Sequence, residues 1–456
     1  MRISLSDINK LQNVAFIRKN LIKNISGVSI DSRNIKEGEI FFAIKGANHD
    51  GHEFVKEVFK KGASCAVIDR NHVNQLKTLD CPLIVVDDTI KALGQLGNII
   101  RKKVGTKIIG ITGSNGKTTT KEMIAHILST KFNILKTEGN LNNQIGIPLN
   151  LFRLKKQHHL AVIEMGINQV GEMSILCDMV EPDYGAITNV GTAHIEFFGS
   201  VEAIAKEKGT LFKYLGNKSG LGFVNNDDKN VRNHAKVLKK KFTFGFNSKS
   251  DVKGKIISVN DLAQPSIIIS YKGKSIDIEL STYGLHTASN ALCAAAVGLK
   301  FGIGLKKIKE ALESFKSYDK RMQVIRINDF VVINDSYNAN PDSMKMAIRT
   351  MNIMKGFEKR VAILGDMLEL GEYSEKFHRE LAYELIENKI DKIYLFGDLV
   401  RFTLDELTGL GYDAKIFDDK KILSEKLRSE LEPNSLILLK GSRKMKMEDI
   451  LNHLRD

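Results

Sequence analysis

One strand, turn and helix beginning at residue 107 constrains the fold of this 456-residue chain more than any other segment. Residues 107–112 form an apolar run that predicts a buried strand, and residues 118–130 have the apolar spacing of a helix. The turn between them reads Gly113-Ser114-Asn115-Gly116-Lys117. Further apolar runs at 160–163 and 184–188 alternate with helical sequence. This alternation predicts a parallel sheet covered by helices.

Two further sections flank this one, and together the three predict an α/β chain of three domains. Residues 1–104 alternate short strand-like runs with amphipathic stretches, which predicts a small mixed α/β domain. Residues 105–319 hold the strand-turn-helix and, at 242–280, a β-rich addition. Residues 320–456 begin a new alternation of strands and helices, which predicts a Rossmann-like, doubly wound domain.

The net charge of +14 raises the question of a nucleic-acid partner. The lysines are spread along the whole chain, and the dense run at 239–241 predicts a solvated face. A lysine-rich surface also favours encounter with a polyanionic small substrate. Charge alone therefore does not choose between the two classes of partner.

The remaining bulk features predict a cytoplasmic chain that does not insert into a membrane. The first residues lack the apolar core of a secretory leader, and no apolar stretch approaches the roughly 20 residues of a membrane span. Cys65, Cys81, Cys177 and Cys293 are widely scattered, with no metal-binding spacing. We expect buried free thiols.

The turn after the first strand has the composition of a phosphate cradle. Glycines at 110, 113 and 116 precede Lys117 and Thr118, so the backbone can curl and point several N–H groups at one anion. The strict pattern G-x-x-x-x-G-K-[ST] fails, because Ile111 occupies the first glycine position. The flanking strand and helix still provide the required context. The sequence therefore predicts a nucleoside triphosphate site at Gly113, Ser114, Asn115, Gly116, Lys117, Thr118 and Thr119.

Three polar clusters follow in the same section, and each has two interpretations. Glu164 ends an apolar strand and is either a metal ligand or a solvated carboxylate. His194 follows the next strand and is either a ligand of a second Mg²⁺ or a structural imidazole. Lys206 and Lys208 lie on the following helix, where solvated lysines would be the ordinary interpretation.

In this order, the loop and the clusters resemble the Mur ligase family, which builds the peptide stem of bacterial peptidoglycan. The resemblance covers essentially the whole chain: a UDP-binding first domain, a P-loop ATPase domain and a Rossmann-like last domain. It implies Mg²⁺-ATP as cofactor, with two ions expected. It also implies that Lys208 is carbamylated, with Lys206 as the neighbouring alternative, and that Thr118, Glu164, His194 and Lys208 hold the metal.

Three strings resemble the branch of the family that adds D-alanyl-D-alanine to UDP-N-acetylmuramoyl-tripeptide (UDP-MurNAc-tripeptide). They are residues 138–148, 197–200 and 334–344. The implied reaction passes through an acyl phosphate and gives the UDP-MurNAc-pentapeptide, ADP and phosphate. Whether the third residue of the acceptor peptide is lysine or diaminopimelate stays open.

The resemblance also assigns residues outside the loop. Catalytic roles fall to Lys117, Glu164, His194, Lys208 and Arg321; His286 and Asn290 border the ATP base, and Asp335, Tyr337 and Asn338 close over its ribose and phosphates. Ser32, Arg33, Lys45 and Gly46 contact the UDP end of the substrate, and Asn142 and Asn143 its muramyl-peptide end. Three residues keep a structural alternative: Arg321 as a surface residue, Asn290 as a helix cap and Asp335 as a turn residue. The basic turn 440–444 has no assigned mechanism.

Other functions stay open at this point. The nearest is a sister ligase that adds a single amino acid. Two alternatives belong to other classes of protein. One is a regulatory P-loop switch or nucleic-acid-stimulated NTPase, and the other is a catalytically silent scaffold. We expect a monomer that acts on the two substrates and binds no nucleic acid.

Overall fold

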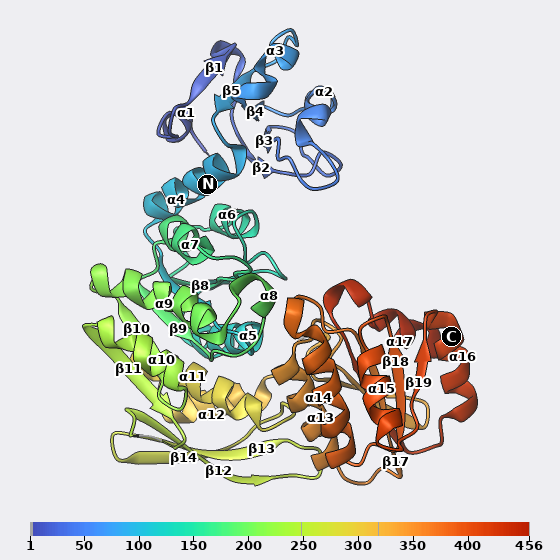
Figure 1. Ribbon diagram of the computed structural model, residues 1–456. Coiled ribbons are helices and arrows are strands. Elements are labelled where there is room, and N and C mark those ends of the chain that lie inside the picture. Colours follow the sequence, from blue (N-terminus) through green and yellow to red (C-terminus); the bar gives the residue numbers. More distant parts are fainter. Residues whose placement is uncertain (1–2, 248, 318, 456) are drawn as a thin grey trace. The chain divides into compact units, whose positions relative to one another are not determined.

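The computed structural model describes residues 3–247, 249–317 and 319–455 (Figure 1). The chain divides into two compact units. The first comprises Met1–Gly110, Phe132–Ile167 and Gly171–Tyr184, and the second comprises Ile111–Lys131, Asn168–Val170 and Gly185–Asp456.

A five-stranded sheet forms the amino-terminal part of the first unit, with strand order β1-β5-β4-β3-β2. Strand β1 pairs antiparallel with β5, and the other neighbours are parallel. The strands are β1 (Ala15–Ile17), β2 (Gly27–Ser29), β3 (Glu39–Phe42), β4 (Cys65–Asp69) and β5 (Leu83–Val86). The helices are α1 (Leu5–Ile8), α2 (Val55–Lys60), α3 (Val73–Leu76) and α4 (Thr89–Val104), with 3₁₀ turns η1 (Lys19–Leu21), η2 (Gly51–Phe54) and η3 (Arg70–His72).

This sheet is buried on both faces, because successive side chains of a strand point to opposite sides. Phe42, Val67 and Ile84 belong to the core that α4 covers, whereas Phe41 and Ala66 belong to the core around α2. Continuous apolar runs are therefore needed in β3, β4 and β5. The mixed α/β fold predicted for this section is confirmed.

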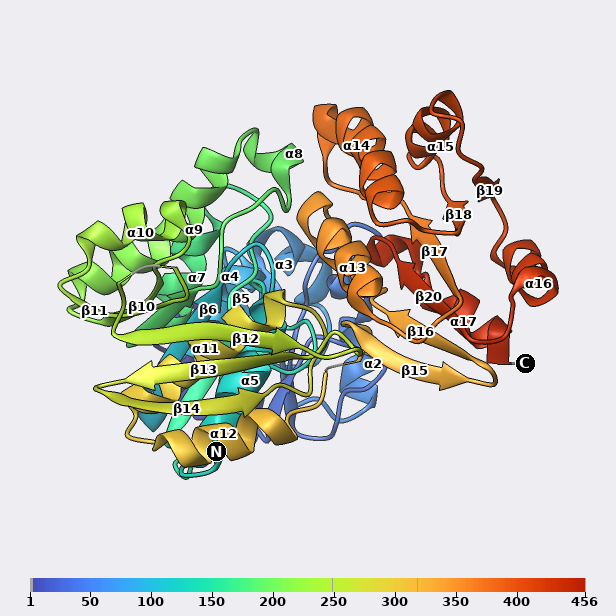
Figure 2. The same ribbon diagram turned by 90° about the horizontal axis from the view of Figure 1, so that it is seen from below.

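The second sheet has nine strands in the order β14-β13-β12-β11-β10-β9-β6-β8-β7. Its strands are β6 (Lys107–Thr112), β7 (Ile134–Lys136), β8 (Leu160–Glu164), β9 (Tyr184–Ile187), β10 (Leu221–Asn225), β11 (Lys240–Gly245), β12 (Val252–Val259), β13 (Pro265–Tyr271) and β14 (Lys274–Glu279). Figure 2 shows β12, β13 and β14 as an antiparallel ribbon beside α11 and α12. The β-rich addition predicted at 242–280 is thereby confirmed as β11 to β14.

The helices of this section follow the strands as expected for alternating α/β structure. They are α5 (Lys117–Ser129), α6 (Gly146–Phe152), α7 (Glu172–Val180), α8 (Ile195–Phe198), α9 (Val201–Asn217), α10 (Lys229–His234), α11 (His286–Lys300) and α12 (Leu305–Ser314), with η4 (Ala235–Val237). Helix α5 begins at Lys117, so the glycine-rich turn ends at its amino terminus.

The third sheet belongs to the second unit and has the order β15-β16-β20-β17-β18-β19. Its strands are β15 (Gln323–Ile327), β16 (Phe330–Asn334), β17 (Lys359–Gly365), β18 (Lys392–Phe396), β19 (Lys415–Phe417) and β20 (Ser435–Lys440). Strand β15 is antiparallel to β16, and the other pairs are parallel. The sequence missed the two edge strands, β15 because it is mostly half-exposed and β19 because it has only three residues.

Helices cover both faces of this third sheet (Figure 2). They are α13 (Pro341–Ile353), α14 (Ser374–Glu387), α15 (Arg401–Gly409), α16 (Lys420–Glu430) and α17 (Glu448–Arg455), with η5 (Gly371–Tyr373) and η6 (Arg443–Met445). Helices α16 and α17 pack against one face through Leu423, Leu427, Ile450 and Leu451, and α13 packs against β17 and β20. The Rossmann-like prediction is confirmed, with two edge strands added, the antiparallel β15 and the parallel β19.

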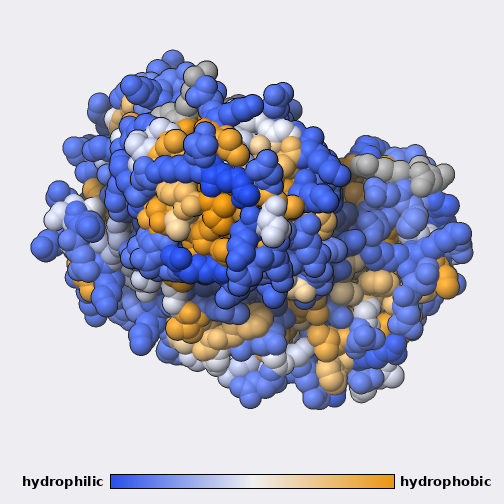
Figure 3. Space-filling view, turned by 90° about the horizontal axis from the view of Figure 1, so that it is seen from above, coloured by the Kyte–Doolittle hydropathy of each residue, from blue (hydrophilic) through white to orange (hydrophobic). Residues whose placement is uncertain are grey.

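The exposure of the lysine run and the burial of the four cysteines match the sequence predictions. Figure 3 shows one face of the molecule, where hydrophilic residues frame an apolar area. The lysines at 239–241 are exposed, as predicted. All four cysteines are buried and, within the described residues, form no disulfide. No helix in the described ranges has the length and apolar character to cross a membrane.

Candidate active site

The turn between β6 and α5 depends on glycine at two positions. Gly113 has φ +150° and Gly116 has φ +76°, both in the range that disfavours side chains. A Cβ at Gly113 would overlap the Thr188 hydroxyl, and one at Gly116 would overlap the Asn290 amide. The close approach of these neighbours therefore requires glycine, which supports the predicted phosphate cradle.

Polar groups that follow β9 fix the shape of this turn. The Asn115 N–H donates to Asn189 Oδ1 at 2.9 Å, and the Asn115 carbonyl accepts from the Thr188 hydroxyl at 2.6 Å. The Gly191 N–H donates to Ser114 Oγ at 2.8 Å. A loop fixed by such bonds needs little rearrangement to bind an anion.

Two lysines of the second unit lie near the turn in different surroundings. Lys117 Nζ donates to the carbonyls of Gly113 at 2.8 Å and Ser114 at 3.3 Å. Lys208 is 1% exposed on α9, whereas Lys206 on the same helix is exposed. Burial and the nearby Lys117 charge lower the pKa of Lys208 well below its ordinary value, although Glu207 opposes this shift. Of Lys206 and Lys208, the two candidates for carbamylation, only Lys208 is in surroundings that favour a neutral amine.

His194 precedes α8 and has a left-handed backbone, with φ +63°. Its Nδ1 lies 2.6 Å from Oε2 of Glu369, a residue that follows β17. The contact with His194 lowers the pKa of the Glu369 carboxyl, although burial opposes the shift. The sequence did not predict Glu369, because only the fold brings the two residues together.

His286 and Asn290 lie one turn apart at the start of α11, as their spacing predicted. Asn290 Oδ1 accepts a hydrogen bond from the Thr120 hydroxyl of α5 at 3.2 Å. Because α11 already begins at His286, Asn290 lies inside the helix, and the interpretation of Asn290 as a helix cap is wrong. Burial lowers the pKa of His286 to about 4, with Asp335 opposing and Lys440 adding to the shift.

Lys440, in the basic turn without an assigned mechanism, is buried at the end of β20. Its ammonium group pairs with the Asp335 carboxylate and donates to the Asn338 carbonyl at 2.9 Å. Asp335 Oδ1 also accepts from the Met322 N–H at 3.0 Å. Lys440 therefore orders the Asp335–Asn338 segment, so Asp335 has a structural role whether or not it contacts a ligand.

Arg321 stacks on Tyr337, with its guanidinium carbon 3.9 Å from the ring centroid. Its Nε is buried and has no hydrogen-bond partner among the described residues. A buried donor without a partner is rare, so this nitrogen is suited to an anion that the chain itself does not supply.

The start of α13 contacts the phosphate turn and the segment after β9, which the sequence did not predict. Asn340 Nδ2 donates to Asn115 Oδ1 at 2.9 Å. Asp342 Oδ2 accepts from the Thr192 N–H at 3.0 Å and from its hydroxyl at 3.1 Å. The family resemblance at residues 334–344 had pointed to this segment, but not to Asn340 or Asp342 individually.

The first unit holds Glu164 and the two asparagines predicted at the substrate. Glu164 is 2% exposed at the end of β8, and Asn142 Nδ2 donates to its Oε1 at 2.9 Å. Burial excludes the solvated interpretation of Glu164. Asn143 Oδ1 accepts from the N–H groups of Ile145 at 3.2 Å and Gly146 at 2.9 Å, so it also stabilises the start of α6.

The residues predicted at the UDP end lie beyond the carboxyl ends of β2 and β3. Arg33 is exposed and pairs with Asp31 at 2.9 Å, which holds the pKa of the Asp31 carboxyl well below its usual range. Lys61 Nζ donates to the Ser32 carbonyl at 2.9 Å. Lys45 and Gly46 are exposed. Their surfaces are available to a ligand.

A cluster of Asp50, His52 and His72 in the first unit has the composition of a metal site. His52 Nδ1 already contacts Asp50 at 2.6 Å, and its Nε2 accepts from the Asp69 N–H at 3.1 Å. The two imidazoles stack with centroids 3.8 Å apart and planes 9° apart. In-plane lone pairs of parallel rings cannot converge on one ion, so the cluster is structural.

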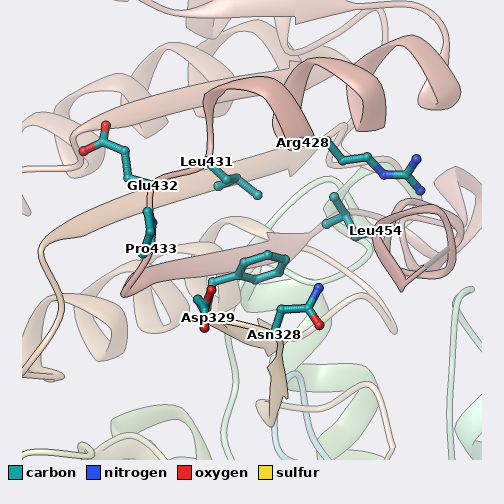
Figure 4. Close-up of a pocket in the computed structure, with 8 residues that line it drawn as sticks. Asn328, Asp329, Arg428, Leu431, Glu432, Pro433 and Leu454 are labelled. Carbon is teal, nitrogen blue, oxygen red and sulfur yellow. The ribbon is translucent and has the colours of Figure 1, made fainter.

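Cavities are also present away from the phosphate turn. One of about 420 Å³ is lined by Asn328, Phe330, Arg428 and Glu432, at the edge where β16 and β20 begin (Figure 4). That is the edge opposite Asp335 and Lys440, whereas ligands of parallel sheets bind at the carboxyl ends. Another, of about 680 Å³, lies in the first unit and includes Gln144, next to Asn143.

Comparison with known proteins connects the whole chain to one family. Residues 24–100 match the Mur ligase family, catalytic domain; residues 111–298 match the Mur ligase middle domain; residues 320–443 match the Mur ligase, glutamate ligase domain. The chain is 34% identical to the UDP-N-acetylmuramoyl-tripeptide--D-alanyl-D-alanine ligase of Bacillus subtilis, over 97% of this chain and 98% of that protein. The enzyme of the same name from Escherichia coli is 33% identical, over 95% and 94%.

Solved structures of MurF proteins also match nearly the whole chain. The crystal structure of MurF from Acinetobacter baumannii matches with a TM-score of 0.90 and 30% identity, over 100% of this chain and 99% of that one. MurF from Thermotoga maritima in complex with ADP matches with a TM-score of 0.83 and 26% identity, over 96% and 98%. The chain belongs to the Mur ligase family.

Proposed function

We propose that this chain is the ATP-dependent ligase that joins D-alanyl-D-alanine to UDP-MurNAc-tripeptide and releases ADP and phosphate. The similarity to ligases of this name extends over nearly the full length of both chains. The proposed enzyme acts as a monomer in the cytoplasm, with domains at 1–104, 105–319 and 320–456.

The observation that carries the mechanism is the buried Lys208 near Lys117. The two ammonium groups repel each other, and burial penalises the charge of Lys208. A neutral Lys208 amine can add to CO₂ and lose a proton, which gives a carbamate anion. The carbamate removes the repulsion, and Lys117 then stabilises it.

The turn fits ATP for two reasons. Glycine is required at 113 and 116, and the N–H groups at the amino terminus of α5 would face a bound phosphate. In the proposed complex, Ser114, Asn115, Thr119 and Lys117 hold the phosphates. Arg321 supplies a further cation through its unpartnered Nε.

Oxygen and imidazole donors fit Mg²⁺. Thr118, His194 and the Lys208 carbamate would hold it, and Mg²⁺ neutralises phosphate charge when bound. Glu164 belongs to the other unit, so its role as a ligand stays a prediction.

The reaction needs charge stabilisation more than a nucleophilic side chain. The terminal carboxylate of the acceptor peptide attacks the γ-phosphorus, and ADP leaves. The amine of D-alanyl-D-alanine then attacks the acyl carbon and phosphate leaves. Lys117 and Arg321 stabilise the negative charge that gathers in both steps.

The remaining predicted contacts belong to the same proposal. His286 and Asn290 border the adenine, and Asp335, Tyr337 and Asn338 close over the ribose and phosphates. The contact of Asn340 with Asn115 of the phosphate turn and that of Asp342 with Thr192 support this arrangement, because they hold the carboxy-terminal segment beside the nucleotide site. Ser32, Arg33, Lys45 and Gly46 take the UDP end of the acceptor, and Asn142 and Asn143 its peptide end.

An amine panel tests this function. The full-length chain is incubated with ATP, Mg²⁺ and UDP-MurNAc-tripeptide, and released phosphate is measured with D-alanyl-D-alanine, L-lysine or D-glutamate. We expect release with the dipeptide alone, at a rate that added DNA or RNA leaves unchanged. Release with a single amino acid but not with the dipeptide would instead support the sister-ligase function. Acceptors with lysine or diaminopimelate at the third position identify the natural acceptor.

A further inference from the structure

Only one nitrogen of the His194 ring is engaged by Glu369. The carboxylate oxygen Oε2 lies 2.6 Å from Nδ1, and the two side chains are 17% and 37% exposed. Nδ1 is buried, and its contact with Glu369 is too poorly aligned to be a hydrogen bond. A carboxylate oxygen this close still favours the proton on Nδ1, because its negative charge and lone pairs attract an N–H and repel a ring lone pair. Nε2 is then the nitrogen with a free lone pair for a ligand.

The contact is part of a longer docking between α8 and the segment 369–373. The Glu196 N–H donates to the Glu369 carbonyl at 3.2 Å, and the Tyr373 hydroxyl donates to the Gly199 carbonyl at 3.0 Å. A Cβ at Gly371, which has φ +52°, would lie 3.0 Å from the Glu196 side chain. These contacts between α8 and the segment 369–373 therefore fix the position of the Glu369 backbone.

The segment that carries Glu369 is anchored in the carboxy-terminal section. The Leu368 N–H donates to Ser442 Oγ at 2.8 Å, and the Met367 N–H donates to His378 Nε2 at 3.1 Å. Glu369 itself has φ +65°, a conformation that non-glycine residues rarely adopt. Such a conformation persists only where the surroundings determine it.

We infer that Glu369 is a positioning residue for His194, which it holds in the Nδ1–H tautomer so that Nε2 is the nitrogen that can ligate a metal ion. Metal-ligating histidines commonly donate their other ring N–H to a carboxylate. Here the carboxylate comes from section 320–456 and the histidine from section 105–319. The imidazole is thus fully oriented only when the two sections are docked. The inference rests on the proposed function in one respect, the metal role of His194.

Two variants of the full-length chain separate the contact between Glu369 Oε2 and His194 Nδ1 from packing. Glu369→Met keeps the side-chain length and removes the acceptor, whereas Glu369→Gln keeps an acceptor oxygen. Glu372→Met is the matched control, because Glu372 is exposed in the same segment. Histidine ¹⁵N NMR identifies the tautomer of His194, with the signal assigned from His194→Gln. Mn²⁺ titration in the presence of ADP, followed by electron paramagnetic resonance, measures metal affinity without turnover.

We expect the Nδ1–H tautomer in the unaltered chain and in Glu369→Gln, and a mixture of tautomers in Glu369→Met. Mn²⁺ affinity should fall about 10- to 100-fold in Glu369→Met and stay unchanged in Glu372→Met. An unchanged tautomer and affinity in Glu369→Met would overturn the inference, as would equal losses in Glu369→Met and Glu369→Gln. If His194→Gln leaves Mn²⁺ affinity unchanged, the metal role in the proposed function fails, and the NMR result alone decides whether Glu369 positions His194.

Discussion

Replacement of Lys440 by methionine should loosen the Asp335–Asn338 segment without emptying the space that the lysine stem fills. The Lys440 side chain is 2% exposed and that of Asp335 is 14% exposed, so their ion pair is almost fully withdrawn from water. Removal of one partner of a buried pair costs about 3–5 kcal/mol. We expect the lower end, about 3 kcal/mol, because Asp335 keeps the Met322 N–H as a donor and retains some exposure.

Hydrogen–deuterium exchange with mass spectrometry measures this loss locally, which suits a chain of several domains whose unfolding need not be two-state. The Asp335 N–H, bonded to the Leu439 carbonyl at 2.9 Å, and the Tyr337 N–H, bonded to the Lys320 carbonyl at 3.2 Å, are the reporters. A loss of about 3 kcal/mol corresponds to roughly hundredfold faster exchange.

The matched control is Lys426→Met, which removes a surface partner of Glu430. Exposed pairs of this kind contribute about 0.2–1 kcal/mol, so exchange near residue 430 should change only slightly. Equal protection of the Asp335 and Tyr337 amides in Lys440→Met and Lys426→Met would show that the buried ion pair does not stabilise the Asp335–Asn338 segment.

Three further predictions concern the site itself. Lys117→Ala should abolish acyl phosphate formation while circular dichroism shows an intact fold, because the cation between the phosphates is lost; normal turnover would contradict the cradle. Lys208→Ala should lose most activity and regain part of it with added short carboxylates, whereas Lys206→Ala should behave as the unaltered chain; full activity of Lys208→Ala without a carboxylate would rule out the carbamate. For His286, whose pKa is about 4 in the folded chain against about 6.5 unfolded, the unfolded chain binds the extra proton as pH falls from 6.5 to 4. Stability should therefore fall over that window by up to about 3 kcal/mol, and His286→Gln should show a shallower loss in thermal unfolding; parallel pH profiles would count against this.

Local patterns predicted most of the fold. Strands β6, β8 and β9 lie within one residue of where their apolar runs were placed, because a strand buried on both faces needs continuous hydrophobic sequence. Strands β15 and β19 were missed, since half-exposed edge strands have a weak pattern. The helical position of Asn290 could not be decided from sequence, because the start of α11 is set by packing rather than by a capping residue.

The candidate site was predictable only where chemistry and chain order coincide. The cradle glycines and Lys117 form one continuous motif, so the sequence identified them. Lys208 was favoured over Lys206 by the family resemblance, and the structure shows that only Lys208 is buried. Glu369 and Lys440 were not assigned, because each acts through a partner more than 100 residues away that only the tertiary fold brings into contact.

The proposed acyl phosphate leaves an isotopic signature that tests the central claim directly. UDP-MurNAc-tripeptide labelled with ¹⁸O in the terminal carboxylate of the accepting residue is turned over with ATP and D-alanyl-D-alanine, and the released phosphate is analysed by mass spectrometry. An acyl-phosphate intermediate predicts one ¹⁸O atom in each phosphate, since the carboxylate oxygen that attacks the γ-phosphorus departs with it. Phosphate without label, formed together with the pentapeptide product, would rule out the acyl phosphate.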